Sequence, residues 1–110
     1  MGSQPLLVLT TCANPQQADE LATALVEQRL AACVNSVEAV SSTYRWASKL
    51  ERGQETLLLI KTTEGRYEAL EGAIRARSRY ELPEVIAVPV CKGSSAYLGW
   101  IEACVADEDQ

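Results

Sequence analysis

The order of hydrophobic and polar positions in the first third of the chain predicts a strand followed by an amphipathic helix. The apolar run from Leu6 to Thr10 has the length of a buried strand. Asn14 and Pro15 then suit the cap and the first position of a helix. Apolar side chains follow at intervals of three or four residues, so we expect this helix to continue to about Ala32. These side chains are Ala18, Leu21, Ala22, Leu25 and Leu30.

The middle of the chain predicts two paired strands. The segment from Cys33 to Trp46 is rich in strand-forming residues, and its alternation slips between Val34 and Val37, which predicts a bulge there. The polar segment 49–54 is expected to form a turn, and 55–62 the returning strand of a hairpin. Because residues 57–60 are continuously apolar, this second strand is expected to be buried on both faces.

The last part of the chain predicts a helix, a strand and a second short helix. Thr63 can cap the first of these helices, whose apolar spacing runs through Leu70 and Ile74. A strand over 84–91 is expected after the break at Pro83. Gly93-Ser94-Ser95 precedes a last short helix with apolar positions up to Val105.

The resulting order is β-α-β-β-α-β with a short C-terminal helix, which is the ferredoxin-like arrangement of the α+β class. It predicts a four-stranded antiparallel sheet with two helices on one face. The strands are too apolar for the other face to remain in water, so we expect another subunit to cover it. We expect one domain over residues 1–110, with a core at about 6–105 and an acidic tail at 106–110.

Composition narrows the class of protein. The chain has 110 residues, of which 47% are hydrophobic, and this excludes disorder over most of its length. The net charge of −5 argues against nucleic acid and anionic membranes as partners. No apolar run approaches the roughly 18 residues of a membrane span. The absence of a recognisable secretion signal and the four scattered cysteines predict a cytoplasmic protein with reduced thiols.

Histidine is absent from the chain, which removes both the commonest general base and the commonest transition-metal ligand. No pairing of a nucleophile with a base is visible either, so we do not expect an enzyme. No cofactor is required by any motif in the sequence.

A few side chains remain as candidate metal ligands. Thiolates suit copper, and Cys12, Cys33 and Cys91 fall near the ends of predicted strands. Glu81 and Glu84 flank Leu82-Pro83, and the proline could present both carboxylates from one rigid loop. The alternatives are buried, inert thiols and carboxylates that are solvated or paired with a neighbouring cation, Lys61 or Arg79.

Aromatic residues and one lysine suggest a second kind of site. Tyr44, Trp46, Tyr80 and Trp100 are most of the aromatic residues of the chain, and could line a ligand cleft or anchor a subunit interface. Lys61 ends an apolar strand, where it could hold an anion or act as a base, or simply reach water.

Five segments together resemble the CutA family of divalent-cation tolerance proteins, in order and over roughly residues 6–102. They are LATALVEQRLAACVN, YRW, ETLLLIKTT, YELPEVIAVPV and AYLGWI. The resemblance implies a ferredoxin-like subunit in a tight homotrimer, a cytoplasmic location, and a link to copper and other divalent cations. The architecture of the family is also similar to that of the trimeric PII signalling proteins. An alternative is therefore a signalling or structural trimer that binds a small ligand or a protein in a groove between subunits.

The sequence departs from the family pattern at three places. Ser78 stands where family members commonly carry histidine, so that metal ligand cannot be carried over. Ala39 stands where glycine is usual, and Ala47-Ser48 replaces an acidic residue followed by glycine. The first departure bears on metal binding, and the other two on loop geometry. Candidates for the groove are Cys33, Tyr44, Trp46, Lys61, Tyr80, Glu81 and Glu84, and those for a metal are Cys12, Glu81 and Glu84.

Overall fold

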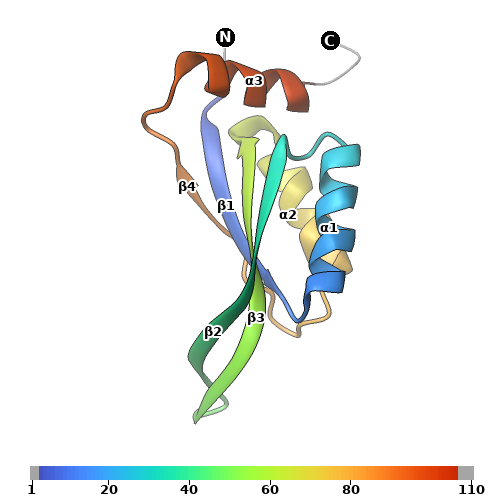
Figure 1. Cartoon of the computed structure of the whole chain (residues 1–110), viewed down its shortest axis with the longest axis vertical. Coiled ribbons are helices and arrows are strands. Elements are labelled where there is room, and N and C mark those ends of the chain that lie inside the picture. The colour runs from blue at the N-terminus through green and yellow to red at the C-terminus, as the bar shows by residue number, and fades with distance from the viewer. Residues whose placement is uncertain (1–2, 107–110) are drawn as a thin grey trace.

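A computed structural model describes residues 3–106 and confirms the predicted order of elements (Figure 1). A four-stranded sheet is covered on one face by α1 and α2, while α3 lies across one end of the sheet (Figure 1). The elements are β1 (Pro5–Cys12), α1 (Pro15–Glu27), β2 (Cys33–Trp46), β3 (Lys49–Thr63), the 3-10 helix η1 (Glu64–Arg66), α2 (Tyr67–Arg77), β4 (Ile86–Pro89) and α3 (Ser95–Val105).

The sheet has the order β2-β3-β1-β4, and each neighbouring pair is antiparallel. Burial alternates along the two central strands, as the two-residue period of a strand requires. The side chains that face the helices are fully buried, with Val8, Leu58 and Ile60 each at 0% exposure. Leu25 of α1 with Leu70 and Ile74 of α2 complete this core.

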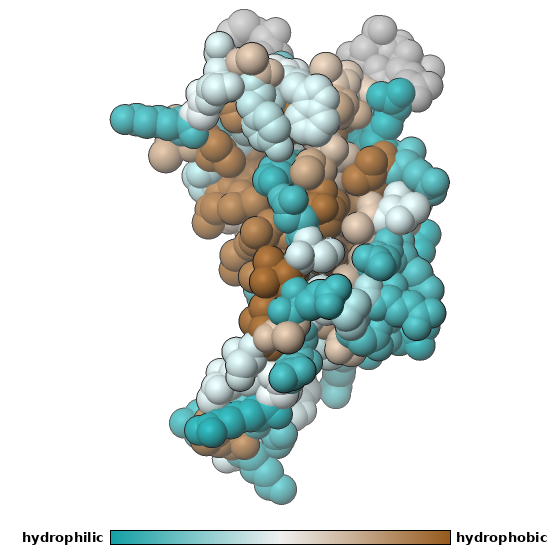
Figure 2. Space-filling view, viewed as in Figure 1, coloured by the Kyte–Doolittle hydropathy of each residue, from teal (hydrophilic) through white to brown (hydrophobic). Residues whose placement is uncertain are grey.

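Alternate residues point to the other face of the sheet, which no helix covers. Leu7, Leu9, Leu57 and Leu59 are only half-buried there, and Ile86 and Val88 of β4 are 52% and 47% exposed. Figure 2 shows the resulting hydrophobic patch on the left of the molecule, over β4 and β1. We call this surface the open face. Within one chain, the expectation of burial on both faces is therefore met on one face only.

The hairpin between β2 and β3 is longer than the sequence pattern predicted. The expected turn over 49–54 is wrong, because β3 begins at Lys49 and pairs directly with Trp46. Ala47 and Ser48 form the turn instead, with φ of 51° and 67°. Two such left-handed residues give the turn a twist that matches its strands. The extra pairing forms an arm beyond the body of the molecule (Figure 1).

The bulge in β2 lies further along the strand than predicted. The register shifts between Val37 and Val40, not between Val34 and Val37. Ala39 adopts a φ of 59° there, in the left-handed region that glycine enters without steric cost. Ala39 and the Ala47-Ser48 turn are also the positions where the family that the sequence resembles usually has a glycine. The backbone therefore keeps a glycine-like conformation without the glycine.

Other element boundaries differ by a few residues. α1 ends at Glu27 rather than about Ala32, and β4 is limited to Ile86–Pro89 within the predicted strand 84–91. The caps are largely confirmed. Asn14 accepts a hydrogen bond from the Gln17 amide at 2.9 Å, and Ser94 accepts one from the Tyr97 amide at 3.1 Å. Thr63 occupies the cap position of η1, but its side chain makes no capping hydrogen bond.

The C-terminal helix is attached to the end of the sheet by apolar and polar contacts. Ile101 and Val105 are buried beside Ala32, and the Arg66 Nε donates to the Val105 carbonyl at 2.8 Å. Beyond Ala106, the predicted acidic tail lies outside the described residues. Across residues 3–106, every helix is too short or too polar to cross a lipid bilayer.

Candidate functional site

A groove of about 700 Å³ lies between the β2–β3 arm and the loop that joins α2 to β4. This volume is in the usual range for a small-molecule site. Five of the seven predicted groove residues line it, namely Tyr44, Trp46, Tyr80, Glu81 and Glu84. We call this feature the groove.

The strand register explains why one wall of the groove is both acidic and aromatic. Glu55 pairs with Val40, and Ser42 pairs with Gly53, so Glu55 and Ser42 share a face of the sheet. Tyr44 and Trp46 follow Ser42 at two-residue spacing and fall on the same face. A side chain at Gly53 would meet nothing within 4 Å, so the space above this part of the sheet is open.

Glu55 lies on the open-face side of the groove and is held by hydroxyl groups. The Tyr80 hydroxyl donates to Glu55 Oε2 at 2.7 Å. Partial burial acts to raise the pKa of Glu55, but hydrogen bonds from Ser42, Tyr80 and Thr11 outweigh it and leave the pKa below its ordinary value. Burial, together with the hydrogen bond to Glu55, raises the pKa of Tyr80. At neutral pH the pair is therefore a carboxylate and a neutral phenol.

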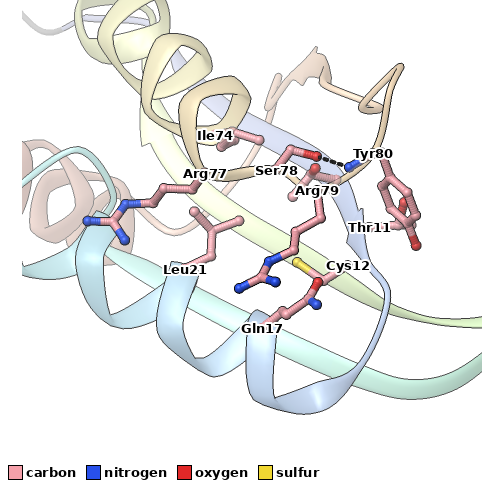
Figure 3. A pocket seen from close by; sticks show the side chains of 10 residues that line it. Thr11, Cys12, Gln17, Leu21, Ile74, Arg77, Ser78, Arg79 and Tyr80 are labelled. Atoms are coloured by element: carbon pink, nitrogen blue, oxygen red, sulfur yellow. Dashed lines mark hydrogen bonds between the residues drawn. The ribbon is translucent and has the colours of Figure 1, made fainter.

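The opposite wall is the loop over 78–85. Glu81 and Glu84 are both exposed there, and Leu82 between them is 73% exposed. The Ser78 hydroxyl accepts a hydrogen bond from the Tyr80 amide at 3.1 Å, which fixes the start of the loop (Figure 3). Among residues 3–106 neither carboxylate forms an ion pair, so the alternative in which they pair with Lys61 or Arg79 is not seen.

A cavity of about 30 Å³, the size of a water molecule, lies behind the groove on the helix-covered side. Cys12 lines it together with Gln17 and Leu21 of α1, and the Arg79 side chain extends toward the same place (Figure 3). Burial, and secondarily the Glu55 carboxylate, raises the pKa of the Cys12 thiol. The thiol is therefore protonated at neutral pH, which is the form that binds metals poorly.

The predicted metal ligands do not converge within one chain. In the part of the chain that the structure describes, no three His, Cys, Asp or Glu side chains are grouped closely enough to hold a metal ion. Cys12 is buried on the helix-covered face, while Glu81 and Glu84 lie at the groove. A three-ligand site from Cys12, Glu81 and Glu84 is therefore not preformed in the subunit.

The remaining sequence candidates lie elsewhere. Cys33 and Lys61 are direct cross-strand partners at the far end of the hairpin, where the Lys61 ammonium contacts the Asn35 side chain. Trp100 lies on α3, with its ring centroid 5.3 Å from that of Tyr97. The structure therefore separates these three candidates from the groove.

Sequence reasoning missed Glu55, which it treated only as the first residue of a strand. The sequence held one signal for Glu55, which is the two-residue period of side chains along a strand. Glu55 is two residues from Leu57 and therefore shares its face, and a carboxylate on an apolar strand face needs polar partners. Those partners, Thr11 and Ser42, come from two other strands, and no local pattern identifies them.

Comparison with known proteins identifies the family. The sequence profile described as "CutA1 divalent ion tolerance protein" matches residues 6–104. The chain belongs to this family. The "Divalent-cation tolerance protein CutA" of Thermus thermophilus is 42% identical over 95 residues, which are 86% of this chain and 92% of that protein. "Protein CutA" of Mus musculus is 45% identical over 91 residues, which are 83% of this chain but about half (51%) of the mouse protein.

Solved structures agree with the family assignment. CutA1 from Oryza sativa superimposes with a TM-score of 0.93 at 34% identity, covering 97% of this chain and 98% of that one. The Cut A1 protein from Thermus thermophilus has a TM-score of 0.90 at 39% identity, covering 93% of this chain and 99% of that one. The ferredoxin-like subunit expected from the sequence is therefore the fold of CutA1 proteins.

Proposed function

We propose that this CutA1 chain acts in the tolerance of divalent cations as a homotrimer that binds copper or another divalent cation and catalyses no reaction. The observation that carries the proposal is the family match over residues 6–104, because CutA1 proteins are named for divalent ion tolerance. The features that support each part of the proposal are the open face, for assembly, and the carboxylates of the groove, for cation binding.

The open face supports the proposed assembly. Exposed side chains such as Ile86 and Val88 form part of a hydrophobic patch that extends over β4 and β1 (Figure 2). A soluble subunit is stabilised when such a patch is covered. The outer edge of β2 also has unpaired backbone groups, since β2 is the first strand in the sheet order. Both features favour association with further copies of the same chain.

We propose that the cation binds at Glu81 and Glu84. Both carboxylates are exposed, and Pro83 restricts the backbone between them. Oxygen ligands suit hard and borderline divalent cations. One subunit does not bring together three metal-binding side chains within residues 3–106. The coordination must therefore be completed by a neighbouring subunit or by water.

The deciding experiment is a calorimetric titration of the reduced, metal-free protein with Cu(II) and with Zn(II). The mass of the same sample is measured by sedimentation. We expect a trimer that binds one cation per subunit with a dissociation constant below about 1 μM. Zinc is included because it has no redox chemistry with thiols. A monomer with native secondary structure would contradict the assembly, and weak uptake without defined stoichiometry would contradict the binding.

Matched variants locate the cation. Glu81→Gln combined with Glu84→Gln should weaken binding at least about tenfold, since it removes both charged ligands. Glu20→Gln combined with Glu27→Gln makes the same change in charge at exposed positions of α1, and should leave binding unchanged. Cys91→Ser tests the exposed thiol. If that variant alone abolishes uptake, the cation site is not in the groove.

We also propose a cytoplasmic location. The four cysteines are free, and a compartment that keeps thiols reduced suits them. Cell fractionation with an antibody against the native protein tests this, and recovery in a secreted fraction would contradict it.

A further inference from the structure

The arm side of the groove differs chemically from the Glu81–Glu84 loop. The register places Glu55, Tyr44 and Trp46 on one face of the hairpin. Within one subunit Tyr44 is 48% exposed and Trp46 is 42% exposed, and both lie on the arm, beyond the apolar patch over β4 and β1 that the proposed neighbouring subunit covers. No side chain fills the space above Gly53, which lies between Glu55 and the position opposite Tyr44.

The residues that the register places on this face carry a net negative charge, because Glu55 and Glu51, which pairs with Tyr44, outnumber Lys49, which pairs with Trp46. Glu55 is held as a carboxylate by three hydroxyl groups, and no cation contributes to the lowering of its pKa. The two arginines that border the groove point elsewhere. Arg45 alternates with Tyr44 and Trp46 along β2 and so faces the other side of the hairpin. The Arg79 side chain extends toward Gln17 and Cys12 (Figure 3).

We infer that this part of the groove binds a small organic cation of the methylated ammonium class, with Glu55 as its counter-ion and Tyr44 and Trp46 as its aromatic walls. Aromatic faces attract such cations through the ring quadrupole, most strongly for tryptophan. A carboxylate can accept about four hydrogen bonds, and the Tyr80 hydroxyl already donates to Glu55 at 2.7 Å, with the Ser42 and Thr11 hydroxyls beside it. Glu55 therefore offers mainly its charge, which suits a cation that has no N–H group to donate.

Size and ligand geometry favour an organic cation over a bare metal ion on this wall. A volume of about 700 Å³ is far larger than one metal ion needs. No group of three metal-binding side chains includes Glu55 among residues 3–106. The inference goes beyond the proposed role in cation tolerance, and shares with it only the groove.

Fluorescence titration of the assembled wild-type protein tests the inference, with choline as the probe. Trp46 lies in the groove and Trp100 lies on α3, so a ligand at this site changes part of the tryptophan emission. We expect a saturable change with choline. The neutral isostere of choline, in which carbon replaces nitrogen, should bind at least about tenfold more weakly because it lacks the charge.

Two variants separate charge from aromatic contact. Glu55→Gln keeps the shape of the side chain but removes its charge, and should weaken choline binding by about tenfold or more, measured by calorimetry. Trp46→Leu lies on the exposed arm, where misfolding is not expected, and should weaken binding about three- to tenfold. Trp100→Leu is the matched control on α3, and should leave choline binding unchanged.

The outcomes are distinct from those for divalent cations. Zn(II) binding should persist in Trp46→Leu, and choline binding should persist in Glu81→Gln combined with Glu84→Gln. The inference is overturned if choline gives no saturation at concentrations on the order of 10 mM. It is also overturned if the neutral isostere binds equally well, or if a neighbouring subunit shields Trp46 from the probe.

Discussion

The two faces of one sheet have different partners although the same strands build them. On the helix-covered face, Leu58 and Ile60 are completely buried by α1 and α2. On the open face, Leu57 and Leu59 alternate with them along β3 but are only half-buried. The difference shows that an apolar strand does not by itself reveal whether its second partner belongs to the same chain.

Truncating a leucine on each face gives the sharpest test of this difference. Leu58→Ala removes side-chain volume from the covered core and should lower the free energy of unfolding by about 2–5 kcal/mol. Leu57→Ala should instead weaken assembly, because its side chain faces the proposed neighbouring subunit. Urea unfolding and sedimentation are measured on both variants. A change of mass in Leu58→Ala with none in Leu57→Ala would reverse the assignment of the two faces.

A pair of equally exposed valines tests the open face with a charge. Val37 on the open face is 43% exposed and Val26 on α1 is 42% exposed. Val37→Lys removes one buried apolar side chain per subunit from the proposed interface. It should weaken the free energy of assembly by about 1.5–3 kcal/mol per subunit and shift the sample toward smaller species. Val26→Lys should leave the mass unchanged. Dissociation of the Val26→Lys protein would mean that α1 also lies in an interface.

The bulge in β2 between Val37 and Val40 is a position where a substitution is expected to stabilise the protein. Ala39→Gly should raise the free energy of unfolding by about 0.5–1 kcal/mol, because glycine relieves the left-handed backbone at φ 59°. Ala69→Gly in α2 is the matched control and should lower stability by about 0.5–1 kcal/mol. Thermal unfolding measures both. A lower free energy of unfolding in Ala39→Gly would contradict this. It would show that the conformational freedom glycine adds to the unfolded chain outweighs the relief of the bulge.

The smallest expected effect concerns Glu55, whose carboxylate should make the free energy of unfolding depend on pH. The pKa of Glu55 is lower in the folded protein than the ordinary value of 4.5. Its stabilising contribution is therefore complete above about pH 4.5 and is lost as the pH falls through the folded pKa. The stability difference between wild type and Glu55→Gln should shrink on acidification, and Tyr80→Phe should reduce the pH dependence in part. A difference that stays constant down to about pH 3 would contradict this origin.

Local patterns predicted the element types well and their ends less well. Asn14 and Ser94 were identifiable as caps because a cap depends on residues within one turn. The turn at Ala47-Ser48 was missed because neither residue favours a left-handed backbone. Long-range pairing of Trp46 with Lys49 and of the strands behind them imposes that conformation.

The candidate site was predictable only in part for the same reason. Tyr80, Glu81 and Glu84 lie within one short segment, so their proximity follows from the chain. Their meeting with Tyr44 and Trp46 depends on the return of β4 beside β1, which places the loop over 78–85 against the arm. Cys12 was a reasonable metal candidate by residue type. Side chains alternate between the two faces along β1, however, and the Cys12 side chain is buried on the helix-covered face.

The sequence by itself determined the α+β class, the order of strands and helices, and the presence of an apolar surface larger than two helices can cover. Those properties depend on periodicity and capping, which act over a few residues. Only the tertiary structure decided that Glu55 meets Tyr80, that Cys12 lies away from Glu81 and Glu84, and that two aromatic rings share a face of the hairpin with the Glu55 carboxylate. These relations depend on register between distant strands, where a shift of one residue exchanges the two faces.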